Sequence, residues 1–216
     1  EATGIDLPGE GESIFHSEKQ FLSNKVDLAT ASFGQNFQIS PIQLITAVSA
    51  VANGGNLMKP YIVKEILDSD GNIVKSTEPT VVRQVISEET SELMCDILET
   101  VVSEGTGKNA YVAGYHIAGK TGTSEKKVRQ AETGRHDLYV SSFIAFAPAD
   151  DPKIAVLVLL DEPSVQPVTG GITAAPVIRR IMSDVLPYLG VEPTYTADEL
   201  EEKDVSVPEV IGMTKT

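Results

Sequence analysis

The sequence predicts an α/β chain of the α+β kind, with a central antiparallel sheet flanked by helices. Three β-rich runs, "GYHIAGKTGT", "YVSSFIAFA" and "KIAVLVLLDE", supply the strands. The second and third runs are joined by "PADDP" alone, whereas parallel strands need a crossover of roughly a dozen residues. These two strands are therefore expected to pair antiparallel, and apolar residues at helical spacing elsewhere in the chain predict the flanking helices.

Composition and charge narrow the class of protein. The 216 residues are 41% hydrophobic, which is ordinary for a globular domain that buries a core. With 17 basic and 31 acidic side chains the net charge is −14, and no basic run is longer than Lys126-Lys127, so nucleic acid is not an expected partner. The single Cys95 permits no internal disulfide and fits no zinc spacing. No stretch approaches the roughly 18 apolar residues of a membrane span.

The N-terminal half predicts a loop, a helix and a hairpin in that order. The first 33 residues are polar and rich in Gly, Glu and Ser, and they predict loop. In "ISPIQLITAVSAVANGG", Ser40 is placed as an N-cap, Pro41 at the first helical position and Gly54-Gly55 past the end. The middle of this helix is apolar nearly all round, which predicts that it is buried. "YIVKEILDSDGNIVKS" predicts a hairpin with Asp70-Gly71 at its turn.

Two further helices are predicted on either side of the strands. The first starts from Ser87, has Glu88 and Glu89 in a first turn where acidic groups suit the helix dipole, and ends by Gly105. The closing helix runs from residue 173 to residue 189. The apolar stripes are Leu93, Met94, Ile97, Leu98, Val101 and Val102 in the first helix, and Val177, Ile181, Met182, Val185 and Leu186 in the second.

The chain is expected to change character after the closing helix. Residues 1–190 form one domain, and the acidic, Pro-containing residues 191–203 form a linker. Residues 204–216 are expected to begin a second module that is cut off.

"GYHIAGKTGTSEK", residues 114–126, matches two different motifs. Gly114, Gly119, Lys120 and Thr121 fit the phosphate-loop pattern G-x-x-x-x-G-K-[ST], and a strand ending in Asp161-Glu162 would suit the magnesium site of such an ATPase. The same letters contain K-T-G, the third element of the serine penicillin-binding and β-lactamase signature. A third possibility is that "GKTG" is only a turn between strands.

The context of the motif disfavours the phosphate loop. A phosphate loop needs a helix that opens directly after G-K-T, because the helix N-terminus holds the anion. Here Gly122 follows, and then a polar stretch without a helical apolar stripe. The antiparallel pairing expected for the neighbouring strands also differs from the parallel sheet of such ATPases. We therefore favour the K-T-G interpretation.

A K-T-G strand suits acyl transfer on a peptide with a free carboxyl end. Side chains alternate along a strand, so Lys120 and Gly122 face one way, and Thr121 and Thr123 the other. All four serve one site only if that site lies along the edge of the sheet. An edge strand offers N–H and C=O groups to an extended peptide, and hydroxyls beside a cation can hold a carboxylate. Gly119 and Gly122 remove side chains where a substrate must come close.

Several longer segments carry a resemblance that covers nearly the whole chain. They are "TGIDLPGE", "FGQNFQISPIQLITAVSAVANGG", "GTG", "VAGYHIAGKTGTSEK", "SFIAFAPADDPKIAVLVLLDEP" and "AAPVIRRI". In this order they resemble the transpeptidase domain of class B penicillin-binding proteins of the division and sporulation type, and the tail "VSVPEVIGM" resembles the start of a PASTA module. The resemblance implies part of a penicillin-binding/β-lactamase-like transpeptidase fold.

The resemblance also implies an activity, a location and partners. The activity is that of a D,D-transpeptidase that cross-links peptidoglycan stem peptides, is acylated by β-lactams and needs no cofactor for its chemistry. Its location is the extracytoplasmic face of a membrane, beside the cell-wall synthesis machinery. A noncatalytic penicillin-sensing or peptidoglycan-binding module remains the alternative.

Carried over onto this sequence, "KTGT" supplies part of a catalytic site. Lys120 resembles the motif lysine, which gives positive potential and a hydrogen bond toward a hydroxyl of the second motif. Thr121 and Thr123 resemble the hydroxyls that bind the terminal carboxylate, with Gly122 between them in the substrate-binding strand. The backbone N–H of Thr123 resembles one of two oxyanion-hole donors, each typically worth about 10²–10³ in rate.

The nucleophile of the family is missing from these residues. The family carries its nucleophile and base in S-x-x-K and its second motif as S-x-N, and no S-x-N occurs here. Ser124 opens "SEKK", which matches S-x-x-K by letters, but it trails the KTGT strand, whereas the nucleophile must open a buried helix. The resemblance implies that both motifs, and the membrane anchor, lie upstream of Glu1 in the same protein.

His136 and Asp137 form a candidate pair of structural zinc ligands. They are adjacent where the strand after KTGT begins, and imidazole and carboxylate are good zinc ligands. Two ligands are too few, so the others would come from the upstream part of the protein, and the metal would stabilise the site without doing chemistry. The alternative is a surface His beside a capping Asp.

Overall fold

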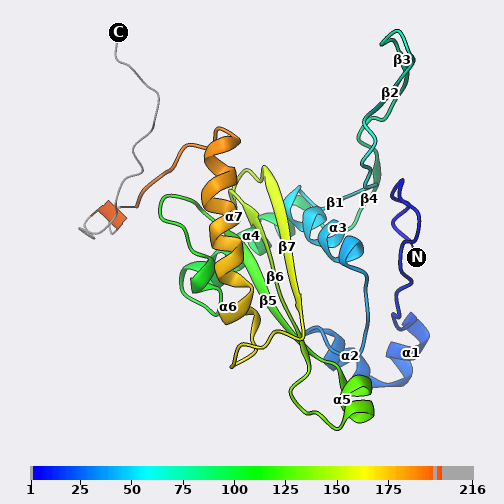
Figure 1. Ribbon diagram of the computed structural model, residues 1–216, viewed down its shortest axis with the longest axis vertical. Helices are drawn as coiled ribbons and strands as arrows, with labels where there is room; N and C mark the ends of the chain where they lie inside the picture. Colours follow the sequence, from blue (N-terminus) through cyan, green and yellow to red (C-terminus); the bar gives the residue numbers. More distant parts are fainter. Residues whose placement is uncertain (1, 197–198, 201–216) are drawn as a thin grey trace. The chain divides into compact units, whose positions relative to one another are not determined.

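The computed structural model describes residues 2–196 and 199–200 (Figure 1). The chain divides into two compact units. The first unit holds the described residues up to Leu98 together with Ala155–Leu157. The second unit holds Glu99–Ile154 and the described residues from Val158 onward. No helix in the described part of the chain has both the length and the apolar character needed to cross a bilayer.

The first unit consists of short elements. They are α1 (Glu18–Ser23), α2 (Lys25–Ala31), α3 (Pro41–Ala52), β1 (Asn56–Met58), β2 (Glu65–Leu67), β3 (Ile73–Ser76) and β4 (Val81–Gln84). Strand β1 pairs antiparallel with β4, and β2 pairs antiparallel with β3. The β2–β3 pair is the predicted hairpin, with Gly71 in the turn at a φ of 84°, a left-handed conformation that glycine adopts readily.

Helix α3 begins where the sequence predicts. Ser40 is its N-cap and Pro41 its first residue, and the Gln43 side chain accepts a hydrogen bond from the Ser40 N–H at 3.1 Å while the Gln43 N–H donates to the Ser40 hydroxyl. The prediction that α3 is buried is wrong in extent. Only Ala50 is fully buried, because within this unit the helix packs against the short strand β1 and most of its apolar surface stays partly exposed.

The prediction of loop for the first 33 residues is also wrong in part, because α1 and α2 lie there. Ser17 and Gln20 form a reciprocal capping box at the start of α1. The Asn24 side chain accepts from the Val26 N–H at 3.0 Å at the start of α2. The S-x-x-Q pattern and the Asn cap can be recognised in the sequence. The helices that they begin are too short to show apolar residues at helical spacing.

The second unit is built around the strands that carry the KTGT motif. Helix α4 (Glu88–Ser103), which is the predicted helix, ends in this unit. The further elements are the 3₁₀ helix η1 (Lys108–Ala110), β5 (Ala118–Glu125), α5 (Lys127–Thr133), β6 (Tyr139–Ala147), β7 (Ile154–Asp161), α6 (Gly170–Thr173) and α7 (Ala175–Tyr188), although Ala155–Leu157 of β7 are grouped with the first unit. The strand order is β5-β6-β7. Helix α7 is the predicted closing helix, preceded by the single turn α6.

The predicted antiparallel sheet is confirmed. Strand β5 pairs antiparallel with β6 from Ala118 opposite Phe146 to Glu125 opposite Tyr139. At one end of the β6–β7 pair the Lys153 N–H donates to the Ala147 carbonyl at 2.9 Å, and at the other end the Glu162 N–H donates to the Tyr139 carbonyl at 2.9 Å. The end of β6 therefore pairs with the start of β7 and the start of β6 with the end of β7, which requires strands of opposite direction.

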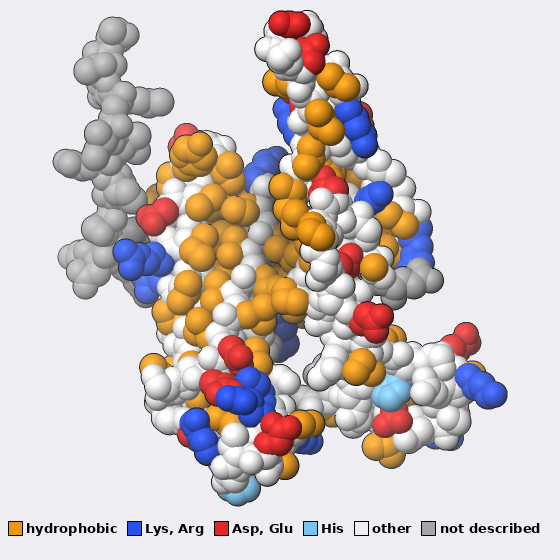
Figure 2. Space-filling model, turned by 45° about the vertical axis from the view of Figure 1, so that its right-hand side comes forward, with side chains coloured by type: hydrophobic (Ala, Val, Ile, Leu, Met, Phe, Trp, Pro, Cys, Tyr) orange, Lys and Arg blue, Asp and Glu red, His pale blue; other side chains and the backbone are white. Residues whose placement is uncertain are grey.

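The core of the second unit lies between β6 and α7. Phe143 and Phe146 of β6, and Ile178, Met182 and Leu186 of α7, have no exposed surface. The α7 residues recur four apart, which places them on one face of the helix against the sheet. In the first unit the β2–β3 hairpin exposes Ile73 and Val74. Figure 2 shows that hydrophobic side chains also lie at the surface of the molecule.

Candidate functional site

The KTGT motif lies on strand β5, at one edge of the three-stranded sheet. In the sheet that the described residues form, β6 covers one side of β5 and no strand covers the other. An edge of this kind offers backbone N–H and C=O groups to an extended peptide. Gly119, Lys120 and Thr121 all lie inside the strand, and the next helix begins only at Lys127. The phosphate-loop and simple-turn interpretations are therefore wrong.

Lys120 places a positive charge at this edge. Its side chain is exposed, and its Nζ donates to the carbonyl oxygen of Thr121 at 3.0 Å and to the Thr121 hydroxyl at 3.4 Å. Among the described residues no ion pair involves Lys120. The lysine thus reaches along the strand edge to a side chain that points to the opposite face, and the structure brings these two sequence-predicted residues together.

Thr121 and Thr123 lie on the face of β5 that α6 covers. The Thr121 hydroxyl is 3.4 Å from the hydroxyl of Thr106, and its methyl group faces Gly171. The Thr123 hydroxyl accepts a hydrogen bond from the Gly170 N–H at 3.3 Å. Thr121 is half-buried and Thr123 is exposed. Two hydroxyls and one ammonium group therefore line a short length of the strand edge, which is a donor set suited to a carboxylate.

The glycines of the motif are needed for packing as well as for access. A Cβ on Gly119 would lie 2.5 Å from a ring carbon of Phe143 and 2.9 Å from the carbonyl oxygen of Ile144. A Cβ on Gly122 would lie 2.4 Å from the hydroxyl of Ser142. Both contacts are made to β6. The two glycines therefore allow β5 to pack against β6, and substrate access is not their only role.

Two further segments pack against the KTGT strand or against each other beside it, and neither was predicted from the sequence to belong to the site. In α6, a Cβ on Gly170 would lie 2.1 Å from the Ser142 carbonyl oxygen and 2.8 Å from that of Gly122. After α4, the loop that contains "GTG" places Thr106 against Gly171, where a Cβ would lie 2.3 Å from the Thr106 carbonyl oxygen. The dipeptide Gly170-Gly171 was the available signal, since paired glycines often mark close backbone approach.

Asn109 joins these two segments to each other. Its side-chain amide donates to the carbonyl oxygen of Gly171 at 2.7 Å. This hydrogen bond helps to hold the backbone of α6 against the KTGT strand. Supporting contacts of this kind keep the side chains of a binding site in position.

The carboxylates that could have served a magnesium ion are engaged in ion pairs. Lys126 Nζ lies 2.8 Å from Asp161 Oδ1 and 2.7 Å from Glu162 Oε1, and Arg129 Nε lies 2.6 Å from Glu162 Oε1. Hydrogen bonds from Lys126 and Arg129 lower the pKa of Glu162. The cluster instead ties the segment after β5 to the end of β7.

His136 and Asp137 do not meet further ligands among the described residues. The Asp137 carboxylate accepts two hydrogen bonds from Arg135, both at 3.0 Å, and the Arg135 guanidinium lowers the pKa of Asp137. His136 is exposed. No group of three or more His, Cys, Asp or Glu side chains suited to a metal occurs in the described part of the chain. The zinc hypothesis stays a prediction.

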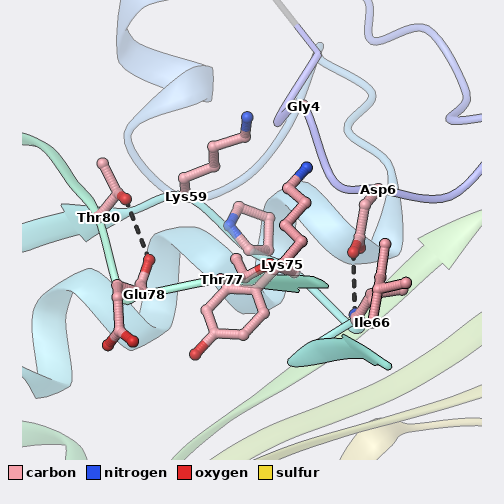
Figure 3. A pocket seen from close by; sticks show the side chains of 11 residues that line it. Gly4, Asp6, Lys59, Ile66, Lys75, Thr77, Glu78 and Thr80 are labelled. Carbon is pink, nitrogen blue, oxygen red and sulfur yellow. Dashed lines mark hydrogen bonds between the residues drawn. The ribbon is translucent and has the colours of Figure 1, made fainter. Parts of the chain in front are cut away.

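The segment "TGIDLPGE" lines part of a recess of about 310 Å³ in the first unit (Figure 3). Asp6 of "TGIDLPGE" accepts hydrogen bonds from the backbone N–H groups of Ile62 and Val63 at 2.8 and 2.9 Å. Lys59 and Lys75 line the recess together with the carboxylates of Asp6 and Glu78. Asp6 therefore fastens the N-terminal residues to the segment that leads into β2. Because two positive and two negative side chains line the recess, it does not favour an ionic ligand.

Comparison with known proteins places this geometry in a family. A family model described as "Penicillin binding protein transpeptidase domain" matches residues 1–183. Stage V sporulation protein D of Bacillus subtilis (strain 168) is 45% identical over 219 residues, which cover 98% of this chain and 33% of that protein. A probable peptidoglycan D,D-transpeptidase PenA of Neisseria flavescens is 34% identical over 191 residues, 87% of this chain and 44% of that protein.

Solved structures show the same fold. Penicillin-binding protein 3 of Mycobacterium tuberculosis, complexed with aztreonam, superposes with a TM-score of 0.77 at 28% identity over 90% of this chain and 44% of that chain. The transpeptidase domain of Burkholderia pseudomallei penicillin-binding protein 3 superposes with a TM-score of 0.74 at 33% identity, over 90% of this chain and 55% of that chain. The chain thus spans between a third and about half of the length of these proteins.

Proposed function

Because the chain belongs to the penicillin-binding protein transpeptidase family, we propose that it carries the substrate-binding strand of a class B peptidoglycan D,D-transpeptidase. The observation that carries the proposal is the arrangement on β5, where Lys120, Thr121 and Thr123 line an edge that no described strand covers. An extended stem peptide would add to this edge as a strand. Its terminal carboxylate would lie against the two hydroxyls and the lysine.

The proposed chemistry is acyl transfer through a serine. The hydroxyl oxygen of the serine attacks the carbonyl carbon of the last peptide bond, and the N–H of Thr123 helps to hold the negative charge on the carbonyl oxygen. The peptide bond then breaks, the terminal residue leaves as an amine, and the ester that remains is attacked by an amine of a second stem peptide. A β-lactam would be opened by the same serine to give a stable ester.

The serine and its lysine base belong, in this proposal, to an S-x-x-K motif upstream of Glu1. Ser124 is an unsuitable nucleophile because it lies within β5, exposed and paired with Val140, and does not open a helix. We also propose that the intact protein acts at the extracytoplasmic face of the membrane, anchored by an upstream segment, beside the cell-wall synthesis machinery. The suggested PASTA start at residues 204–216 lies outside the described residues.

Two features support the choice of this function. The protein of known structure that was crystallised with aztreonam shares the fold at 28% identity, and the relative from B. subtilis is named as a sporulation protein. We propose a role in the peptidoglycan synthesis of sporulation on that second ground.

Labelled penicillin tests the proposal. The intact protein is incubated with the label, digested and analysed by mass spectrometry to locate the adduct. We expect one stoichiometric adduct, on a serine upstream of Glu1, and we expect Ser124→Ala to leave it unchanged. No adduct, or an adduct on Ser124, would overturn the assignment. An adduct without cross-linking of stem peptides would favour the penicillin-sensing alternative.

A further inference from the structure

The residues that follow α7 lie against the turn that leads into the KTGT strand. We call residues 191–196 together with Glu199 the strap, and residues 111–116 the Gly114 turn. The Thr194 N–H donates to the carbonyl oxygen of Gly114 at 2.7 Å. The segment that the sequence predicted as a linker is therefore bonded to the domain at this point.

Glu199 makes the second attachment. One oxygen of its carboxylate accepts hydrogen bonds from the Gly114 N–H, at 3.0 Å, and from the Tyr111 hydroxyl. The other oxygen accepts from the Thr196 N–H at 2.6 Å, while the Glu199 N–H donates to the Thr196 hydroxyl at 3.2 Å. Burial alone would raise the pKa of Glu199, but the hydrogen bonds from Tyr111, Thr196 and Gly114 outweigh it and lower the pKa.

Gly114 is shaped to receive the strap. Its φ is +75°, and a Cβ there would lie 2.8 Å from Pro193 and 2.9 Å from the ring of Tyr195. The strap therefore rests on a position that a side chain would block. A cavity of about 450 Å³ lies beside these contacts and is lined by residues of the strap, the turn and the end of α4.

The Gly114 turn is the lead-in to the KTGT strand. Beyond it, Ile117 and Ala118 are buried, and Lys120 follows two residues after Ala118. The end of the turn is also held where the Ala149 N–H donates to the His116 carbonyl at 2.8 Å and where His116 Nδ1 meets Glu99 Oε1 at 2.5 Å. At its start the Tyr111 N–H donates to the Lys108 carbonyl at 3.1 Å. The strap adds hydrogen bonds at Gly114, between these two ends.

We propose that Glu199 is a positioning residue for the transpeptidase, an inference that rests on the proposed function. It fastens the strap to the Gly114 turn and so fixes the register and direction in which β5 leaves the turn. In this proposal the functional domain therefore includes residues beyond α7, as far as Glu199. Tyr111 is its partner in this role.

The test compares Glu199→Ala with Glu192→Ala in the intact protein. Glu192 is an exposed acid of the same strap whose charge, like burial and Tyr195, raises the pKa of Tyr115 in the turn, so its removal controls for the loss of charge. Glu199→Ala removes two hydrogen bonds to the turn, and because each contributes on the order of 1 kcal/mol we expect the rate of acylation by labelled penicillin to fall about three- to tenfold. Glu192→Ala should stay within about twofold of the wild type.

Two further variants separate positioning from stability. Tyr111→Phe removes only the hydroxyl donor and should lower the rate in the same direction, whereas Glu199→Gln keeps an acceptor for the Gly114 N–H and should restore most of it. All rates are measured well below the unfolding temperature of each variant. A fall in melting temperature without a fall in rate would overturn the positioning role.

Amide hydrogen exchange keeps the inference testable even if the protein is not acylated. Glu199→Ala should speed exchange at Gly114 and at the amides that open β5, with no change for Glu192→Ala. If the wild type forms no penicillin adduct, the proposed function fails, and exchange alone decides whether the strap holds the turn. Equal exchange in the two variants would overturn the inference, whatever the outcome with penicillin.

Discussion

Replacing Gly170 by alanine should destabilise the second unit more than the same change within the KTGT motif. The added Cβ would lie 2.1 Å from the carbonyl oxygen of Ser142 and 2.8 Å from that of Gly122. Both are backbone atoms of the sheet and cannot turn away. At Gly122 the nearest atom, at 2.4 Å, is the hydroxyl oxygen of Ser142, which can rotate. At Gly11, which has an ordinary φ, no atom lies within 4 Å.

These contacts set an order of magnitude for each variant. Overpacking against a fixed backbone costs about 1–3 kcal/mol. Alanine is favoured over glycine in a helix by up to about 1 kcal/mol, and this gain offsets part of the cost. For a domain of this size each kcal/mol lowers the melting temperature by about 2–4 °C. We expect Gly170→Ala to lower it by several degrees, Gly122→Ala by less, and Gly11→Ala by almost nothing.

Thermal unfolding of the intact protein, followed by calorimetry, gives the comparison. Gly170→Ala should also slow acylation by labelled penicillin, because the Gly170 N–H that donates to the Thr123 hydroxyl is displaced with the helix. Equal melting temperatures for Gly170→Ala and Gly11→Ala would refute the packing argument. A larger loss of stability in Gly122→Ala than in Gly170→Ala would contradict the premise that the Ser142 hydroxyl can rotate away whereas the sheet backbone cannot.

Three further predictions follow from the site. The 216-residue chain alone should form no stoichiometric penicillin adduct, and an adduct on Ser124 in that chain would contradict the upstream nucleophile. The pKa of Glu162 is lowered by hydrogen bonds from Lys126, so its stabilising contribution is present above its unfolded value of 4.5 and is lost as the pH falls through the lower folded value. Glu162→Gln should therefore flatten the pH dependence of the melting temperature at pH values below 4.5, and an unchanged pH profile would argue against the ion pair. If His136 and Asp137 bind zinc, the intact protein should retain zinc after washing with a chelator, and His136→Ala should lower its melting temperature; absence of both effects would remove the metal from the account.

Local signals in the sequence predicted the elements that they determine physically. The Ser40 cap and Pro41 determine where α3 begins. The "PADDP" connection is too short for a parallel crossover, so β6 and β7 pair antiparallel. The K-T-G interpretation requires Lys120 and both threonines to lie on an edge strand, and β5, which contains them, is an edge strand of the sheet. Their role in binding stays a prediction.

Features that depend on distant contacts could not be predicted in the same way. Burial of α3 depends on what packs against it, which an apolar pattern does not specify. Gly170 matters because of Ser142, a residue of another element, and nothing adjacent in the sequence indicates that contact. Glu199 lies in a stretch whose acidic composition predicted a linker, although the pair of Thr196 and Glu199 fits the T-x-x-E capping pattern and could have been noticed.

The central claim is that the edge of β5 binds the carboxylate of the substrate or drug, and it is tested most directly by acylation kinetics beside thermal unfolding. The measurement compares the intact wild type with Lys120→Ala and Thr123→Val, using labelled penicillin for the rate and calorimetry for the melting temperature. Both side chains are exposed, so neither change should cost much stability. The account predicts a rate lowered by about tenfold or more, as expected when a charge-assisted hydrogen bond of about 1.5–3 kcal/mol is lost. The melting temperature should stay within about 2 °C of the wild type for Lys120→Ala and within about 4 °C for Thr123→Val, which also loses the hydrogen bond from Gly170. An unchanged rate, or losses of rate and stability that match each other, would show that KTGT supports the fold and does not bind the substrate.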